Sequence, residues 1–266
     1  MTSAGKNPTN THLGIATVLA TALLALPVQA QEPSSPPAYL FMVDSTIAQE
    51  DAGDWADAVT LLAKSHAKHP DGNMWATYRR LTGGPGETIR TFFPLNQMAD
   101  LDDWQSNREI VTEVLGKDRA RIVLSDLDLR SSTSERILSH SDKLSHPSVQ
   151  FKAYKYTWVL EVQVEEGKMT EYAALAKRLA EIQKESAAGT WMVYGNALGG
   201  DRSVLYYLYG FDKFGEIDGW PSRLEMASES LGASEAARLL AAVDAVTATT
   251  TSLWQLETEL SQLDVK

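Results

Sequence analysis

Trp191 to Trp220 reads WMVYGNALGGDRSVLYYLYGFDKFGEIDGW, and a counterpart of the same length, Trp75 to Trp104, WATYRRLTGGPGETIRTFFPLNQMADLDDW, begins 116 residues earlier. Extended without a gap, residues 75–138 and 191–254 share 15 identities over 64 positions. The shared positions include the Trp and Tyr of W-x-x-Y and a Gly-Gly pair. The chain is therefore an internal duplication, and each half should have the same order of structural elements.

The hydrophobic pattern gives that order. Strand-like runs open the halves at 39–47 and 156–164, and each is followed by a helical apolar stripe. Two further strand-like segments follow, at 74–81 and 88–95 in the first half, then helical segments and a short final strand near 135–140 or 251–257. Strand, helix, strand, strand, helix, strand is the split βαβ, or ferredoxin-like, order.

The central strands of the second half are apolar on both faces. Val204, Tyr206 and Leu208 alternate with Leu205, Tyr207 and Tyr209. Two helices cover only one face of a ferredoxin-like sheet, so something else must bury the other face. We therefore expect an α+β fold in which two tandem ferredoxin-like repeats pack their sheets together into a barrel within one chain.

This combination resembles the dimeric α+β barrel superfamily, and within it the NIPSNAP and antibiotic-biosynthesis-monooxygenase-like groups. The resemblance rests on W-x-x-Y in the second strand, Gly-Gly at 83–84 and 199–200, and an aromatic third strand at 88–93 and 204–209. It spans roughly residues 39–258. It implies the barrel fold but no single activity, because the superfamily contains cofactor-free oxygenases, haem-handling enzymes, isomerases and proteins without known catalysis.

The N-terminus has the pattern of a secretory signal. Lys6 precedes an apolar run from Leu13 to Leu26, and Val28-Gln29-Ala30 is an A-x-A-like cleavage site. An uncleaved N-terminal anchor is the alternative. The expected segments are a signal peptide at 1–30, a disordered spacer at 31–38, the first repeat at 39–140, a linker at 141–155, the second repeat at 156–258 and a tail at 259–266. We expect a periplasmic or secreted mature chain without a membrane span.

Composition restricts the partners. The formal net charge is −11, which disfavours a nucleic-acid partner because such proteins need a basic face. The chain has no Cys, so its fold cannot depend on disulfides. His66, His69 and Asp71 lie close in sequence, but no pattern supplies a third ligand, and we expect no metal site. We also expect no cofactor, with haem as the alternative that the resemblance leaves open.

Two histidines are weak catalytic or haem-ligand candidates. His66 falls on the apolar stripe of the first helix, where the second half carries Leu179, and His140 aligns with Leu256. A titratable side chain whose counterpart is apolar is a clue to function. A hydrogen-bonded core or helix-end histidine is the structural alternative.

Ligand-binding candidates come from the strands: Trp75, Tyr78, Arg90, Trp191, Tyr194 and Tyr207. In each W-x-x-Y pair one ring should pack under the helices and the other should face the opposite sheet, because positions three apart on a strand lie on opposite faces. The functional interpretation is an aromatic-lined cavity at the barrel centre, and the alternative is core packing. We expect Arg90 either to be salt-bridged or solvent-facing, or to bind an acidic group.

Three hypotheses follow from the sequence. The first is an exported binding or accessory protein for a small apolar or aromatic ligand. The second is an enzyme of the oxygenase or haem-handling type with one working half. The third is a structural or interaction module with a filled barrel and no ligand.

Overall fold

The computed structural model describes residues 35–263 except 83–87, 103–106, 147–150, 184–189, 219, 221–230, 235 and 238–241. The expected signal peptide and the Gly83-Gly84 turn lie outside these described residues. None of the described helices is long and apolar enough to cross a membrane.

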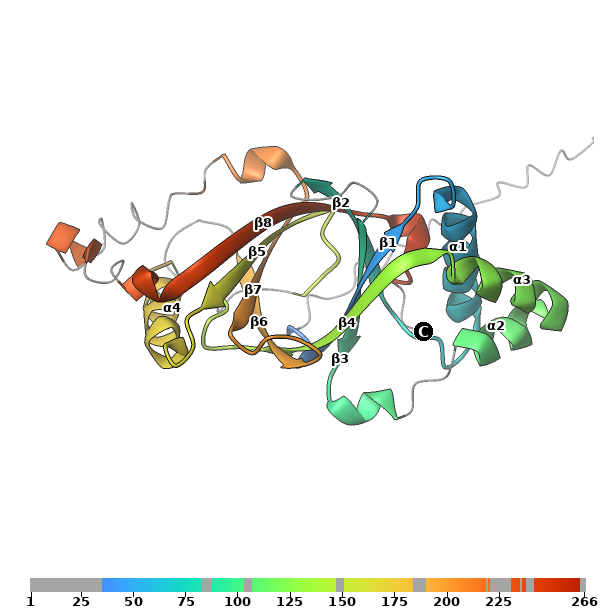
Figure 1. The fold of residues 1–266 in the computed structure, drawn as a ribbon, viewed down its shortest axis with the longest axis horizontal. Coiled ribbons are helices and arrows are strands. Elements are labelled where there is room, and N and C mark those ends of the chain that lie inside the picture. Colours follow the sequence, from blue (N-terminus) through green and yellow to red (C-terminus); the bar gives the residue numbers. More distant parts are fainter. Residues whose placement is uncertain are drawn as a thin grey trace, which may run out of the picture. The chain divides into compact units, whose positions relative to one another are not determined.

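The first half contains β1 (Tyr39–Ile47), α1 (Ala52–Lys68), β2 (Ala76–Thr82), β3 (Thr88–Leu95), α2 (Asn107–Leu115), α3 (Lys117–Leu127) and β4 (Arg130–His140). The second half contains β5 (Tyr156–Val164), α4 (Met169–Gln183), β6 (Trp191–Leu198), β7 (Val204–Phe211) and β8 (Val246–Leu256). In Figure 1, α1, α2 and α3 gather beside the strands of the first half, and α4 lies beside those of the second.

The eight strands form one closed antiparallel barrel in the order β1-β3-β2-β8-β5-β7-β6-β4. Each half contributes a four-stranded sheet, β4-β1-β3-β2 or β8-β5-β7-β6, which is the ferredoxin-like strand arrangement. The β2–β8 and β4–β6 pairings join the halves. The predicted fold class is confirmed, and the two sheets meet edge to edge through hydrogen bonds, which leaves no free sheet edge in the ring.

The final strand of each half is longer than the sequence suggested. β4 begins at Arg130 and β8 at Val246, several residues before the expected starts. Residues 131–135 (SSTSE) and 247–251 (TATTT) are exposed on both faces and, apart from Ala248, polar, so they show no apolar alternation. They still pair along β1 and β5, because backbone hydrogen bonding does not require apolar side chains.

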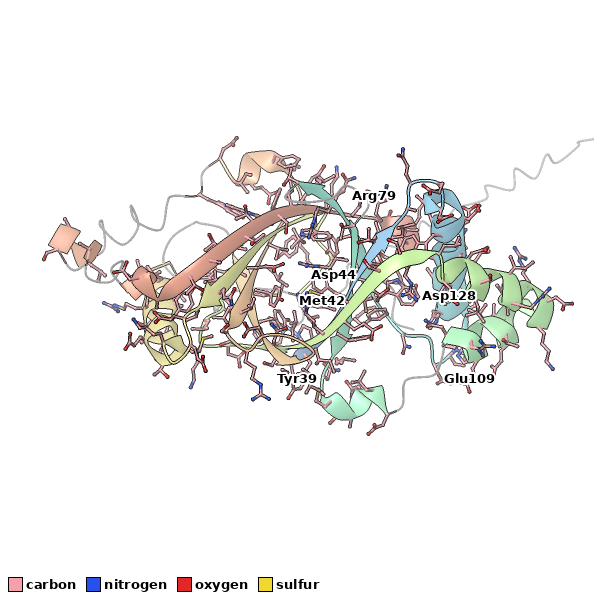
Figure 2. The ribbon with its side chains drawn as sticks, viewed as in Figure 1. Tyr39, Met42, Asp44, Arg79, Glu109 and Asp128 are labelled. Atoms are coloured by element: carbon pink, nitrogen blue, oxygen red, sulfur yellow. The ribbon has the colours of Figure 1, made fainter. Side chains whose placement is uncertain are left out.

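Alternation along the strands separates the core inside the barrel from the packed layers under the helices. Inward-facing side chains fill the barrel, and outward-facing ones pack under the helices. On β1, for example, Met42 and Asp44 extend into the barrel (Figure 2). At the β6–β7 turn, Gly199 has φ +78° and a Cβ there would lie 2.6 Å from the Glu135 carbonyl oxygen of β4. Only glycine tolerates this positive φ together with such a close approach.

Candidate functional site

The two W-x-x-Y motifs orient as the strand geometry predicts. Tyr78 and Tyr194 point into the barrel core, whereas Trp75 and Trp191 pack on the outer faces of their sheets under the helices. The indole N–H of Trp75 donates to the Leu260 carbonyl at 2.8 Å, and that of Trp191 donates to the Leu144 carbonyl at 2.9 Å. Each tryptophan therefore anchors a loop to the outside of its sheet, and neither lines the barrel interior.

The barrel interior is occupied by side chains. Burial raises the pKa of Tyr78 to about 12 and raises that of Tyr194 above its usual value as well, so both phenols are neutral. The buried apolar residues are Leu40, Met42, Tyr78, Phe92, Leu138, Val159, Met192, Tyr194, Tyr206, Leu208 and Trp254. This packing corresponds to the core alternative for Tyr78 and Tyr194.

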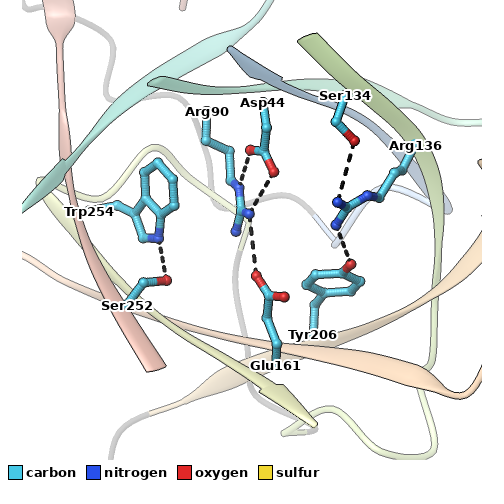
Figure 3. Close-up of polar contacts among 8 residues, drawn as sticks. All are labelled: Asp44, Arg90, Ser134, Arg136, Glu161, Tyr206, Ser252 and Trp254. Carbon is cyan, nitrogen blue, oxygen red and sulfur yellow. Dashed lines mark hydrogen bonds and ion pairs between the residues drawn. The ribbon is translucent and has the colours of Figure 1, made fainter. Parts of the chain in front are cut away.

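Arg90 lies inside the barrel at 1% exposure. Its Nε and Nη2 donate to the two carboxylate oxygens of Asp44 at 2.6 and 2.9 Å, and Nη2 also reaches Glu161 of the other half at 3.3 Å (Figure 3). Burial opposes the charged form of Arg90, but the two carboxylates raise its pKa above the usual value. Arg90 is thus salt-bridged, which was one of the expected outcomes.

His140 is part of the junction between the halves. Its Nδ1 lies 3.0 Å from Asp142 and its Nε2 lies 2.9 Å from Ser145 Oγ, and Ser145 Oγ in turn accepts the Val193 backbone N–H at 2.8 Å. Burial lowers the pKa of His140, with Asp142 opposing this. Both ring nitrogens are engaged, so this geometry corresponds to the structural alternative for His140.

A cavity of about 490 Å³ lies between the outer face of the first-half sheet and its helices. The aromatic part of its wall comes from Phe41, Trp55, Trp75 and Phe93. The other lining residues are Val43, Ser45, Val59, Leu62, Thr77, Thr91, Asn107, Leu127, Arg130 and Glu135. Its volume lies within the range of small-molecule sites, and mostly apolar walls with a few polar groups are typical of such sites.

Several residues of the cavity wall carry hydrogen-bonding groups. Thr77 and Thr91 share a hydrogen bond between their hydroxyls at 3.2 Å. The indole Nε1–H of Trp55 is buried and finds no hydrogen-bond partner among the described residues. A buried donor without a partner costs about 1–3 kcal/mol.

His66 stands behind the cavity wall at 1% exposure, with its ring edge-on to Trp75 at 4.9 Å between centroids. The Asn73 backbone N–H donates to its Nδ1 at 3.0 Å, so the neutral ring carries its proton on Nε2. Nε2 has no hydrogen-bond partner among the described residues, and the side chain of Asn107 lies near enough to the ring to favour its protonated form. Burial lowers the pKa of His66 to about 4, the Asn107 contact opposes this, and His69 adds to it. His66 is thus a neutral hydrogen-bond donor.

The corresponding layer of the second half is filled by a tyrosine pair. Tyr207, which aligns with Thr91, packs with Tyr172 of α4, and their hydroxyls are 2.9 Å apart. Val193 takes the place of Thr77, and Trp191 that of Trp75. Two phenol rings therefore occupy the space that the first half leaves open beside Thr91.

The candidate residues thus fall into three places. Trp75 lines the cavity, and His66 packs against Trp75. The residues that belong to the barrel are Tyr78, Arg90, Tyr194 and His140. Trp191 and Tyr207 lie in the second-half layer. Sequence reasoning missed Trp55 and Asn107. Thr91 was not among the candidate residues either. The size difference between Thr91 and Tyr207 was the available signal for a cavity.

Neither a family model nor a curated protein matches the sequence. Its fold does match those of solved structures. A putative monooxygenase from Lactobacillus acidophilus NCFM aligns with TM-score 0.51 at 11% identity, over 85% of this chain and 97% of its own. An anthrone oxidase-like protein aligns with TM-score 0.50 at 12% identity, over 86% and 95%. These are dimeric α+β barrel proteins, and at this identity they establish the shared fold alone.

The expectation of no cofactor was wrong. A chlorite dismutase from Candidatus Nitrospira defluvii, in complex with cyanide, shares the fold with TM-score 0.49 at 7% identity over 85% of this chain and 93% of its own. Chlorite dismutases are haem proteins.

The described side chains do not fit a haem in the cavity. His66 lies behind Trp75 and does not line the cavity wall. His69 has Glu113 on Nε2 at 2.9 Å and the Asp71 N–H on Nδ1, and His140 has both nitrogens engaged. Among the described residues, no group of three or more His, Cys, Asp or Glu is placed to hold a metal ion.

Proposed function

We propose that the protein binds a small, largely aromatic molecule in the first-half cavity, and that the second half is its structural support. The observation that carries this proposal is the contrast at matched positions. Thr91 leaves a cavity of about 490 Å³ with four aromatic wall residues, whereas Tyr207 and Tyr172 fill the same layer of the second half.

The ligand should carry a hydrogen-bond acceptor. Trp55 is a wall residue whose buried indole N–H has no partner among the described residues, and the Thr77 and Thr91 hydroxyls can donate or accept. A carbonyl or phenolic oxygen on an aromatic frame satisfies both the apolar wall and these polar groups. A hydrocarbon without an acceptor would leave the indole donor unsatisfied.

Native mass spectrometry of the purified protein, followed by calorimetric titration with 2-acetylnaphthalene, tests the proposal. Thr91→Tyr should fill the cavity as Tyr207 fills its counterpart and should weaken binding by about tenfold or more. Thr251→Tyr adds the same side chain at an exposed position of β8 and is the matched control. Equal binding by the wild type and Thr91→Tyr, with the variant folded, would contradict the proposal.

Oxidation of the bound molecule by dioxygen is the second candidate function. The observation that favours it is that three structures with a TM-score of 0.50 or more are described as putative monooxygenases or as anthrone oxidase-like. A fold hosts many activities, so the support is an analogy. An oxygen electrode with an anthrone-type substrate tests it, and oxygen uptake that Thr91→Tyr abolishes but Thr251→Tyr preserves is the expected result.

We also propose that the chain is exported and cleaved after Ala30. The support is the apolar run from Leu13 to Leu26 before the Val28-Gln29-Ala30 sequence. N-terminal sequencing of the protein from its own host should begin at Gln31. Recovery of the intact N-terminus from the cytoplasm would contradict this.

A further inference from the structure

A polar cluster inside the barrel, separate from the cavity under the helices, carries more positive than negative charge. Its members are Arg80, Arg90, Arg136, Asp44 and Glu161, together with Tyr206 and Trp254 (Figure 3, except Arg80). Three guanidinium groups face two carboxylates, which leaves one unit of positive charge in a chain whose formal net charge is −11. The net positive charge of this cluster is thus opposite in sign to the net charge of the whole chain.

The two carboxylates are already committed to Arg90. Asp44 accepts from Nε and Nη2 of Arg90, and Glu161 accepts from Nη2. Arg136 donates to the Tyr206 hydroxyl at 2.6 Å and to Ser134. Arg80 has no ion pair with a described residue. Positive charge that no carboxylate balances therefore lies on Arg80 and Arg136, and Arg136 already donates to two hydroxyls.

Unused donors remain on the two arginines that stack on Trp254. The guanidinium carbons of Arg80 and Arg90 lie 4.7 and 4.4 Å from the centroid of that ring. Nη1 of Arg90 and Nε of Arg80 are buried and have no hydrogen-bond partner among the described residues. Buried charged donors without an acceptor are costly, and an anion placed at them would remove the cost.

Electrostatic repulsion between Arg80 and Arg90 also favours a bound anion at this site. Burial lowers the pKa of Arg80, and the charge of Arg90 lowers it further, while Asp44 and Glu161 only partly compensate. Arg80 is half-buried, and Ser134 and Thr250, at the level of the carboxylates on β4 and β8, are exposed and uncharged. This end of the barrel thus gives a small anion a polar entry.

We propose that the barrel mouth binds one small planar oxyanion, a carboxylate or an inorganic oxyanion, between Arg80 and the free edge of Arg90. Guanidinium groups recognise planar oxyanions through paired N–H donors, which a spherical halide cannot engage in the same way.

Calorimetric titration of the full protein with sodium formate and with sodium nitrate, each replacing sodium chloride at constant ionic strength, tests this. One site per chain is expected, with formate or nitrate preferred over chloride. Arg80→Gln should weaken binding by about tenfold, and Arg80→Lys should recover only part of it because an ammonium lacks the planar pair of donors.

Arg79→Gln is the matched control, because Arg79 is the neighbouring residue on β2 but points out of the barrel and pairs with Glu257 at 2.9 Å. It should leave the dissociation constant unchanged within about twofold. Circular dichroism should show that Arg80→Gln stays folded, since the substitution removes a repulsion with Arg90. Equal heats for formate, nitrate and chloride, or an Arg79→Gln effect as large as that of Arg80→Gln, would overturn the proposal.

Discussion

The two helix–sheet layers of this protein are built on one pattern but packed differently. In the second half, Tyr172 and Tyr207 meet through their hydroxyls and close the layer. In the first half, Thr91 replaces the strand tyrosine, and a cavity lined by Trp55 and Trp75 remains. Among the described residues, the two layers thus differ by the strand tyrosine, and we propose that only the first-half layer holds a ligand.

The barrel interior differs between the halves as well. Asp44 and Glu161 occupy equivalent places on β1 and β5, but Arg90 of β3 matches Tyr206 of β7. The single arginine therefore serves carboxylates from both halves. It joins the halves electrostatically, and its loss should be felt throughout the barrel.

The largest effect is expected for Arg90→Ala. The substitution removes the guanidinium that both Asp44 and Glu161 bind, so the free energy of unfolding should fall by about 3–5 kcal/mol. Urea denaturation measures this. Arg79→Ala, on the outer face of β2, should cost less than about 1 kcal/mol, and equal losses for the two would show that the interior ion pairs do not stabilise the barrel.

Tyr207→Thr should come next, because it copies the first half into the second. It opens a void beside Val193 and removes the hydroxyl that bonds the Tyr172 hydroxyl, so we expect a loss of about 2–4 kcal/mol in the free energy of unfolding. Thr91→Ala, which removes a much smaller group from a layer that already holds a cavity, should cost less than about 1.5 kcal/mol. A similar cost for both would remove the proposed contrast between the layers.

Much of the fold, but only part of the candidate site, could be predicted from the sequence. The repeat and its alternation were enough to predict the ferredoxin-like order, the barrel, and the opposite orientations of Trp75 and Tyr78. The first residues of β4 and β8 were not predicted as strand. Exposed Ser and Thr on both faces give no alternation of apolar and polar side chains. The pairing of Arg90 with Glu161 crosses between halves, and the cavity depends on how side-chain volumes add in space, so neither could be found from spacing along the chain.

His66 should make stability depend on pH. Its folded pKa of about 4 lies below its usual 6.5, so the unfolded state binds more protons between these values. The stabilisation from neutral His66 is complete above about pH 6.5 and is lost as the pH falls through that window toward 4. His66→Gln, which keeps a side-chain acceptor for the Asn73 N–H, should flatten this part of the stability curve in urea titrations, and an unchanged slope would contradict the assignment.

Tyr172→Phe should have the smallest effect. It removes one hydroxyl from the tyrosine pair but keeps both rings, so we expect a loss of about 1 kcal/mol. Thermal unfolding followed by circular dichroism measures it. A loss as large as that of Tyr207→Thr would mean that the hydrogen bond, and not ring volume, closes the second layer.

The central claim is that the first-half layer binds a ligand and the second-half layer does not. The indole N–H groups of Trp55 and Trp191 test it directly, because Trp191 donates to the Leu144 carbonyl whereas Trp55 has no partner among the described residues. In an ¹⁵N-resolved NMR titration with 2-acetylnaphthalene, the Trp55 indole signal should move, that of Trp191 should stay, and naphthalene, which lacks an acceptor, should shift Trp55 less. Equal movement of both indoles, or movement of Trp191 alone, would contradict the account.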